Sequence, residues 1–192
     1  MKKIIVSTLI AILSLWYIPV WASNQIDAAW ILAYHGIITA QEDSSDYRVG
    51  NTITRREMLK IMMNISGKNV ITSCGSVHKF NDLDSNDWGC KYADAAVKAG
   101  YIAKNDSYRP DDNISQVEAL KMIMKAKDMQ REENSNWKLG YVNTAYEQWI
   151  LESKFTNYDT AALRGWIFVI VQDAIIEDSS DTGSILDILI NQ

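Results

Sequence analysis

The stretch Asn51-Thr52-Ile53-Thr54-Arg55-Arg56-Glu57 returns later in the chain as Asp112-Asn113-Ile114-Ser115-Gln116-Val117-Glu118. A tyrosine precedes the isoleucine by six positions in both copies, at Tyr47 and at Tyr108. Self-similarity at this scale is typical of repeat architectures, in which each copy is one supersecondary unit. The sequence therefore predicts a fold built from similar units that pack on one another.

Each copy is predicted to begin with a short helix, over residues 27–35 in the first copy and 91–99 in the second. The helices end at Gly36 and Gly100, and glycine is the preferred residue just past a helix end. The loops that follow are rich in Asp, Asn and Ser, which favour turns.

A second helix is predicted to start where the two copies match best. Thr54 with Glu57, and Ser115 with Glu118, follow the capping-box pattern that satisfies the free amides of a first helical turn. Apolar residues then recur at helical spacing, which predicts a stripe packed into a core. They are Met58, Ile61, Met62 and Ile65 in one copy and Val117, Leu120, Ile123 and Met124 in the other.

A third copy is more altered. We expect its first helix over Asn143–Leu151, with Lys154-Phe155-Thr156 in place of the glycine turn. Residues 162–166 then stand where the helix-starting motif stood, and they keep Arg164 but carry Trp166 in place of the glutamate.

The N-terminus is predicted to be a secretory signal peptide. Lys2 and Lys3 precede an almost entirely apolar run over residues 4–20, and Ala22 offers a cleavage site. An uncleaved membrane anchor is the alternative, because the run is close to the roughly 18 apolar residues that a spanning helix needs. The predicted division of the chain is 1–22 signal peptide, 23–66 first repeat, 67–79 connector, 80–127 second repeat, 128–136 connector, 137–176 degenerate third repeat and 177–192 C-terminal tail.

Composition excludes several classes of protein. The chain has 192 residues, 47% hydrophobic and 22% charged, with a net charge of −5, which is ordinary globular composition. Because phosphate contacts need clustered cations, this acidic balance argues against a nucleic-acid partner.

Cys74 and Cys90 are the two cysteines of the chain. In an oxidising compartment such a pair indicates a disulfide, and the alternative is two free thiols in a reduced envelope. A zinc site is poorly supported, because the spacing does not fit and His78 is the one nearby histidine.

The second copy resembles an S-layer homology repeat, and the resemblance extends over nearly all of residues 24–176. Residues 53–57 are similar to the family's threonine-arginine-alanine-glutamate signature, with Arg56 in place of alanine. The matching positions in the second copy are Phe80, Asp82-Leu83, Trp88, Gly100-Tyr101-Ile102, Tyr108, Pro110 and the Ser115-to-Glu118 box.

This resemblance implies an all-α fold of three helix–loop–helix repeats around a pseudo-threefold axis. It also implies a secreted protein at the cell wall or cell surface that binds a wall polysaccharide or peptidoglycan in grooves between repeats. The family's usual polymer is an anionic, pyruvate-bearing secondary wall glycan. A module that binds an envelope protein partner on the same scaffold is the alternative, and after signal cleavage no membrane association is expected.

The candidate ligand-binding residues follow from the family signature and from aromatic side chains that stack on sugars. Arg55 matches the signature arginine, Arg164 matches by position, and Gln116 has lost the cation. We expect Arg55→Ala to weaken wall binding while the helical circular dichroism spectrum stays unchanged. The full set is Arg55, Arg164, Thr54, Glu57, Trp88 and Trp30.

An enzyme is not predicted, and no cofactor or metal is expected. Asp82, Asp84 and Asp87 crowd one turn but lack the glycine and the distal glutamate of a calcium loop. His35 and His78 fall in no recognisable catalytic pattern.

Overall fold

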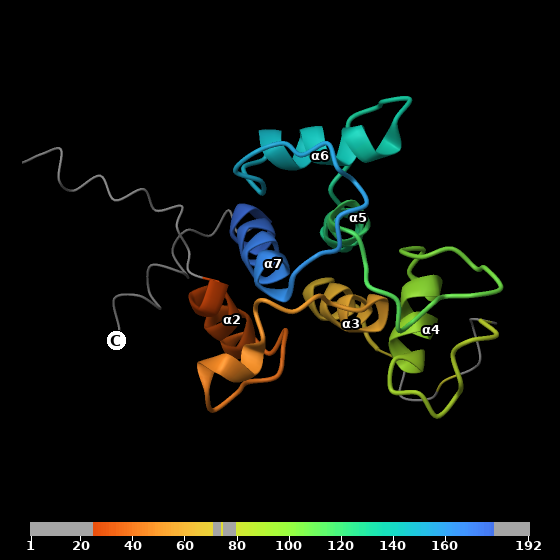
Figure 1. The fold of residues 1–192 in the computed structure, drawn as a ribbon. Helices are drawn as coiled ribbons and strands as arrows, with labels where there is room; N and C mark the ends of the chain where they lie inside the picture. Colours follow the sequence, from red (N-terminus) through yellow and green to blue (C-terminus); the bar gives the residue numbers. More distant parts are fainter. Residues whose placement is uncertain (1–24, 71–73, 75–79, 179–192) are drawn as a thin grey trace, which may run out of the picture.

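The computed structural model describes residues 25–70, 74 and 80–178, and within them the protein is helical (Figure 1). These residues form six α-helices and one short 3₁₀ helix, and they contain no β-strand. The elements in chain order are α2 (Gln25–Tyr34), η2 (Ser44–Tyr47), α3 (Arg55–Ile65), α4 (Cys90–Lys98), α5 (Gln116–Ala126), α6 (Trp137–Glu147) and α7 (Arg164–Asp178). The predicted all-α class is confirmed.

The helices pack in a cyclic order. The helices that follow the matching motifs, α3, α5 and α7, lie at the centre of Figure 1, with α2, α4 and α6 outside them. Each outer helix packs on the central helix that precedes it around the ring: α4 on α3, α6 on α5, and α2 on α7. Helix α2 therefore closes the ring by packing on α7, the last helix that the structure describes.

A closed ring of backbone hydrogen bonds lies where the three central helices begin. Ile53 N donates to Ala162 O (3.1 Å), Ala162 N donates to Ile114 O (2.9 Å), and Ile114 N donates to Ile53 O (3.1 Å). All three side chains are fully buried, so these backbone groups need protein partners. The ring supports the predicted pseudo-threefold arrangement of three repeats, which stays a prediction.

Both predicted capping boxes are present. Thr54 N donates to Glu57 Oε2 (3.0 Å), and Ser115 N donates to Glu118 Oε2 (3.2 Å). The helices that they start, α3 and α5, bury the predicted apolar stripes, apart from Ile65, which is half-buried.

The predicted helix and turn of the third copy are wrong by several residues. The helix is α6, over Trp137–Glu147, and the turn after it is at Trp149 instead of residues 154–156. The backbone angle φ is +58° at Trp149, which is similar to the values of +69° at Gly36 and +75° at Gly100 in the other two turns. A tryptophan therefore occupies a left-handed position that favours glycine, so the glycine signal that marked the other two turns is missing here.

The structure joins Cys74 to Cys90, with the two Cα atoms 5.6 Å apart. The disulfide ties the connector after α3 to the first residue of α4. The predicted signal peptide and residues 179–192 of the predicted tail lie outside the described residues. Within the described part, no helix has both the length and the apolar character of a membrane span.

Candidate functional site

Arg164 joins the start of α7 to the start of α3. Its Nη1 lies 2.9 Å from Glu57 Oε1, and its Nε donates to the carbonyl oxygen of Tyr47 (3.1 Å). The other carboxylate oxygen of Glu57 accepts from the capping-box amide of Thr54. One glutamate therefore caps its own helix and binds the arginine of another, and such an arginine–glutamate pair between two central helices is called here a joint. The Arg164 side chain is only 16% exposed.

Arg55 makes the same contacts one step further around the ring. Its Nη1 lies 3.0 Å from Glu118 Oε1, and its Nε donates to the carbonyl oxygen of Tyr108 (2.9 Å). The Arg55 guanidinium also lies 5.2 Å from the centre of the Tyr108 ring. Burial alone would raise the pKa of Glu118, but hydrogen bonds from Ser115 and the charge of Arg55 outweigh it, so that pKa lies below its usual value.

The third contact of this kind, between the start of α5 and the segment before α7, has no ion pair. Gln116 N donates to Thr160 O (2.9 Å), as Arg55 N donates to Asp112 O (2.9 Å) and Arg164 N to Asn51 O (2.8 Å). The backbone contact is kept, but a glutamine side chain cannot form the charged fork. Among the described residues, two arginine–glutamate ion pairs therefore connect the starts of the central helices.

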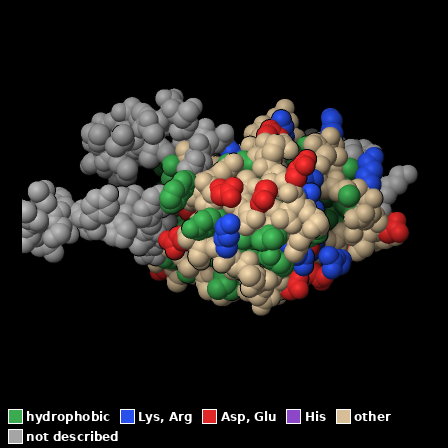
Figure 2. All heavy atoms as spheres, turned by 90° about the horizontal axis from the view of Figure 1, so that it is seen from above, with side chains coloured by type: hydrophobic (Ala, Val, Ile, Leu, Met, Phe, Trp, Pro, Cys, Tyr) green, Lys and Arg blue, Asp and Glu red, His purple; other side chains and the backbone are tan. Residues whose placement is uncertain are grey.

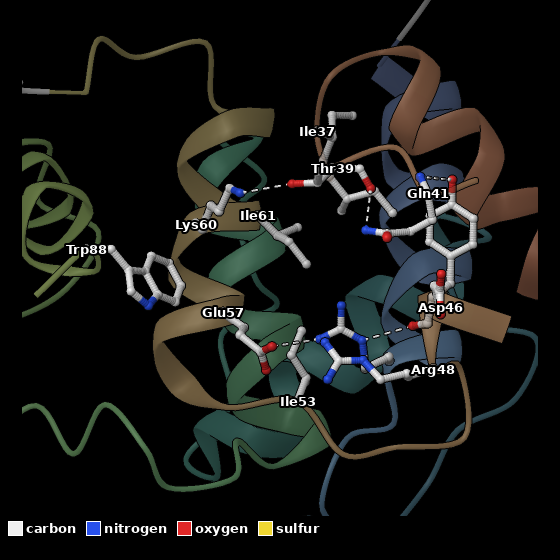
Figure 3. A pocket seen from close by; sticks show the side chains of 13 residues that line it. Ile37, Thr39, Gln41, Asp46, Arg48, Ile53, Glu57, Lys60, Ile61 and Trp88 are labelled. Carbon is white, nitrogen blue, oxygen red and sulfur yellow. Dashed lines mark hydrogen bonds and ion pairs between the residues drawn. The ribbon is translucent and has the colours of Figure 1, made fainter. Parts of the chain in front are cut away.

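A groove opens beside the Arg164–Glu57 joint. Two adjoining hollows, of about 260 and about 380 Å³, share Arg48, Glu57, Trp88 and Arg164, and together they are called here the α3/α7 groove. Figure 3 shows the first hollow, with Glu57 and Lys60 extending from α3 on one side and Asp46 and Arg48 on the other. Cationic, acidic and aromatic side chains thus gather in one concave site.

Trp88 is held in place by Arg56. The Arg56 guanidinium lies 5.8 Å from the centre of the indole ring and forms ion pairs with Asp87 (Nη1–Oδ2, 2.5 Å) and Asp111. Contact between a guanidinium and an indole face is attractive. Because Trp88 is still 47% exposed, part of its surface stays open to a ligand.

The cations of the α3/α7 groove differ in their partners. Arg164 is paired with Glu57, and Arg56 with two aspartates. Lys60 Nζ donates to Thr39 Oγ1 (3.4 Å). Arg48 is exposed, and no hydrogen bond or ion pair engages its guanidinium within the part of the chain that the structure describes.

The groove brings together four of the six residues predicted from the sequence. Arg164, Glu57, Trp88 and Thr54 line it. Arg55 and Trp30 line neither hollow.

Trp30 lies on α2, where its ring and the Tyr47 ring are nearly perpendicular, with their centres 5.2 Å apart. Sequence reasoning missed Arg48 and Lys60. The repeated Tyr-Arg pair at residues 47–48 and 108–109 was a signal that marked the first of them.

A matching set of residues surrounds the Arg55–Glu118 joint, and it is called here the α3/α5 cluster. Its side chains are folded onto one another: Lys121 Nζ lies 4.8 Å from the centre of the Trp137 ring, and Arg109 Nη1 lies 3.8 Å from Asp112 Oδ2. Burial, with the nearby charge of Lys125, lowers the pKa of Lys121. The cluster consists of Arg55, Tyr108, Arg109, Glu118, Lys121 and Trp137.

Asp82, which raised the question of calcium, has a structural role. Its carboxylate accepts hydrogen bonds from Ser107 Oγ, from Tyr108 N (2.8 Å) and from Arg109 N (2.7 Å). Burial would raise the pKa of Asp82, and these bonds lower it by more. The carboxylate therefore fixes the loop that leads into α5, and the described residues hold no group of acidic, histidine and cysteine side chains arranged for a metal.

Comparison with known proteins gives two findings. Residues 79–120, which run from the segment before α4 into α5, match the S-layer homology domain. The chain is also 24% identical over 160 residues to the Middle cell wall protein of Brevibacillus brevis (strain 47 / JCM 6285 / NBRC 100599). The alignment covers 81% of this chain and 14% of that relative's length. The similarity to the S-layer homology domain thus lies in the segment that contains Trp88, α4 and the start of α5.

Proposed function

We propose that this chain is an exported cell-envelope protein that binds a cell-wall polymer without covalent attachment and without catalysis. The binding site is the α3/α7 groove. The polymer is an anionic secondary wall glycan or peptidoglycan.

The observation that carries the proposal is the meeting of Trp88, Arg48 and Arg164 in one groove. An exposed indole offers an apolar face to the carbon–hydrogen face of a sugar ring, and its N–H is left to find a polar partner. Guanidinium groups bind carboxylates and phosphates through two parallel hydrogen bonds. Together these groups fit a sugar that carries an acidic substituent.

The size of the first hollow fits one unit of a polymer. Its volume of about 260 Å³ lies just below the range of about 300 to 1,000 Å³ that is usual for drug-sized ligands. The hollow joins the larger, more open one, so a chain can continue along the groove.

The comparisons support the same role at the level of the family. The matched domain is named for surface-layer proteins, and the aligned relative is named as a cell wall protein. The matched residues include Trp88 and Glu118, whereas Arg48, Arg55 and Arg164 lie outside them.

The net charge of −5 does not oppose binding of an acidic polymer. Figure 2 shows acidic and basic side chains interspersed over one face of the molecule, rather than a face of a single sign. At physiological ionic strength, exposed charges more than about 8 Å apart are largely screened. The groups that line the groove therefore determine the interaction.

The test is co-sedimentation of residues 23–192 with purified cell-wall sacculi, before and after the acid treatment that strips secondary polymers. Binding that is lost on stripping supports the secondary glycan, and binding that persists supports peptidoglycan. Absence of binding to both preparations contradicts the proposal.

A matched pair of variants ties the binding to the groove. Trp88→Ala removes the indole that lines it, and Trp149→Gly removes a 67% exposed indole that lines neither hollow. We expect only the first variant to weaken co-sedimentation. Equal losses would mean that exposed tryptophans adsorb to sacculi without a defined site.

A surface on α2 favours the second candidate, a module that binds an envelope protein. Trp30, Ile31 and Tyr34 are 42%, 39% and 75% exposed, and their spacing places them near one another on the helix. Contiguous exposed apolar side chains mark protein-binding surfaces. Failure to bind either sacculus preparation would make this surface the next one to test.

A further inference from the structure

Two arginines have left-handed backbones at matching places in the fold. Arg48 (φ +50°) follows Tyr47 at the end of η2, and Arg109 (φ +59°) follows Tyr108 before α5. Residues with a Cβ are disfavoured in this region, which glycine occupies without a penalty and asparagine tolerates. A long cationic side chain in this conformation therefore suggests that the side chain is needed.

The surroundings of Arg48 point to a ligand as its partner. Arg48 lines both hollows of the α3/α7 groove. It is one of the side chains labelled around the hollow in Figure 3. The carboxylate of Glu57 is already bound to Arg164 and to the capping-box amide.

The other arginines of the described ring are engaged by the protein itself. Arg164 binds Glu57 and Tyr47, and Arg55 binds Glu118 and Tyr108. An arginine whose Nε and one Nη already bind protein atoms has fewer free N–H groups left to form two parallel bonds with an acidic group. Among the residues that the structure describes, none engages the guanidinium of Arg48, so its fork is available to a ligand.

We infer that Arg48 is the residue of the α3/α7 groove that binds the acidic substituent, carboxylate or phosphate, of the wall polymer. Arg164 acts as a positioning residue that holds Tyr47, and with it the backbone next to Arg48. This inference rests on the proposed function and assigns the charge recognition to a residue outside the helix-starting motif.

The experiment compares Arg48→Asn with Arg109→Asn in the chain of residues 23–192. Both substitutions remove an arginine from a left-handed position and supply a residue that accepts this backbone, so they have the same effect on the local conformation. Arg109 is the matched control, because it already faces Asp112 at 3.8 Å and lines neither hollow.

We expect Arg48→Asn to weaken binding to unstripped sacculi about 10-fold or more, as expected for the loss of a charge-assisted bond. Arg109→Asn should change it by less than about 3-fold. Both variants should unfold at or above the wild-type temperature. Arg48→Lys should give an intermediate loss, since it keeps the charge but not the fork.

Competition identifies the acidic group. Oligogalacturonate supplies carboxylates on sugar rings, glucose 6-phosphate supplies a phosphate, and dextran is neutral. We expect one of the two acidic probes to displace the wild-type protein from sacculi, and dextran to leave it bound.

Four results would overturn the inference. Wild-type binding with no loss in Arg48→Asn would overturn it and leave the proposed function standing. A loss of equal size in Arg109→Asn, or displacement by dextran as effective as by the acidic probes, would also contradict it. Failure of the wild type to bind sacculi would overturn the proposed function first, and the inference with it.

Discussion

The α3/α7 groove and the α3/α5 cluster carry the same residue types around the same kind of joint. Each has an arginine bound to a capping-box glutamate, a tyrosine whose carbonyl accepts from that arginine, a left-handed arginine, a lysine and a tryptophan. In the groove, no interaction among the described residues joins Lys60 to Trp88, and none engages the guanidinium of Arg48. In the cluster, Lys121 covers Trp137 and Arg109 faces Asp112.

The difference shows that the repeat pattern specifies the joint but not the site. The arginine–glutamate pair depends on residues inside the repeated motif, so it forms twice. Whether the adjoining lysine, arginine and tryptophan stay open depends on residues that differ between the copies, since Arg56 corresponds to Val117 and Asp112 to Asn51. Thr39 engages Lys60, Arg56 holds Trp88, and Asp112 engages Arg109.

The disulfide is expected to give the largest effect, and it distinguishes the two regions. Cys90 is fully buried and begins α4 just after Trp88, whereas α6 begins at Trp137 with an Asn136 cap. A cross-link over a loop of this length stabilises by roughly 3 kcal/mol in the chain-entropy description. We expect Cys74→Ser with Cys90→Ser to lose about this much free energy of unfolding, measured by urea denaturation, and to weaken wall binding.

Mass spectrometry of a non-reduced digest checks the linkage directly, and reduced wild-type protein is the control. Reduced wild type and the double variant should unfold at the same urea concentration. If reductant leaves the stability of the wild type unchanged, the disulfide does not support the groove.

The two tryptophans give the next largest effect. Truncating a well-packed aromatic anchor in a binding site weakens the binding free energy by about 2 kcal/mol or more, which is roughly 30-fold in affinity. Trp88→Ala should therefore reduce sacculus binding by about this factor, while Trp137→Ala changes it by less than about 3-fold because Trp137 lines neither hollow of the groove. Comparable losses of binding in the two variants, measured by co-sedimentation, would show that both regions bind polymer.

Much of the fold could be predicted from the sequence, because capping boxes and glycine turns are local signals. Thr54 with Glu57, and Ser115 with Glu118, placed α3 and α5 correctly. The third copy was misaligned because its turn has Trp149 where the others have Gly36 and Gly100. No rule based on residue type assigns a left-handed turn to a tryptophan.

The candidate site was less predictable, because it depends on contacts between distant segments. The motif marked Arg55 as a full match and Arg164 as a match by position, but the groove forms only where Arg48 and Trp88 converge on Arg164. The sequence contained no signal that α4 would bring Trp88 to the helix of the preceding copy. The closure of the ring by α2 and α7 decides which arginine lies in the groove.

The two joint arginines should show equal structural effects and different effects on binding. Arg55→Ala and Arg164→Ala each leave a partly exposed carboxylate without its partner, which should lower the free energy of unfolding by about 1–2 kcal/mol after allowance for solvent screening. Only Arg164→Ala should weaken wall binding, since only Arg164 lines the groove. This differs from the expectation for Arg55 that followed from the family signature.

Urea unfolding and co-sedimentation of the same preparations separate the two readouts. Lys98→Ala, at the exposed end of α4, serves as the control for removal of a cation. Weaker binding by Arg55→Ala at temperatures where it is fully folded would return Arg55 to the ligand site and make the α3/α5 cluster a second one.

Acid titration of Glu118 should show the smallest effect. Burial raises the pKa of this carboxyl, but the Ser115 hydrogen bonds and Arg55 lower it by more, so the folded-state pKa lies below the ordinary value of 4.5. A lowered carboxyl pKa contributes stability that is present above the unfolded-state value and is lost as the pH falls through the folded-state value. In Arg55→Ala the opposing effect of burial remains, so we expect the titration midpoint of Glu118 to move upward. Carboxyl carbon NMR measures this midpoint. The loss of stability between about pH 5 and pH 3 should also become shallower. Arg164→Ala leaves the Arg55–Glu118 pair intact, so the Glu118 midpoint should stay at its wild-type value. An equal upward shift in that variant would mean that the two arginine–glutamate pairs are not independent, and that they are coupled through the backbone ring at Ile53, Ile114 and Ala162.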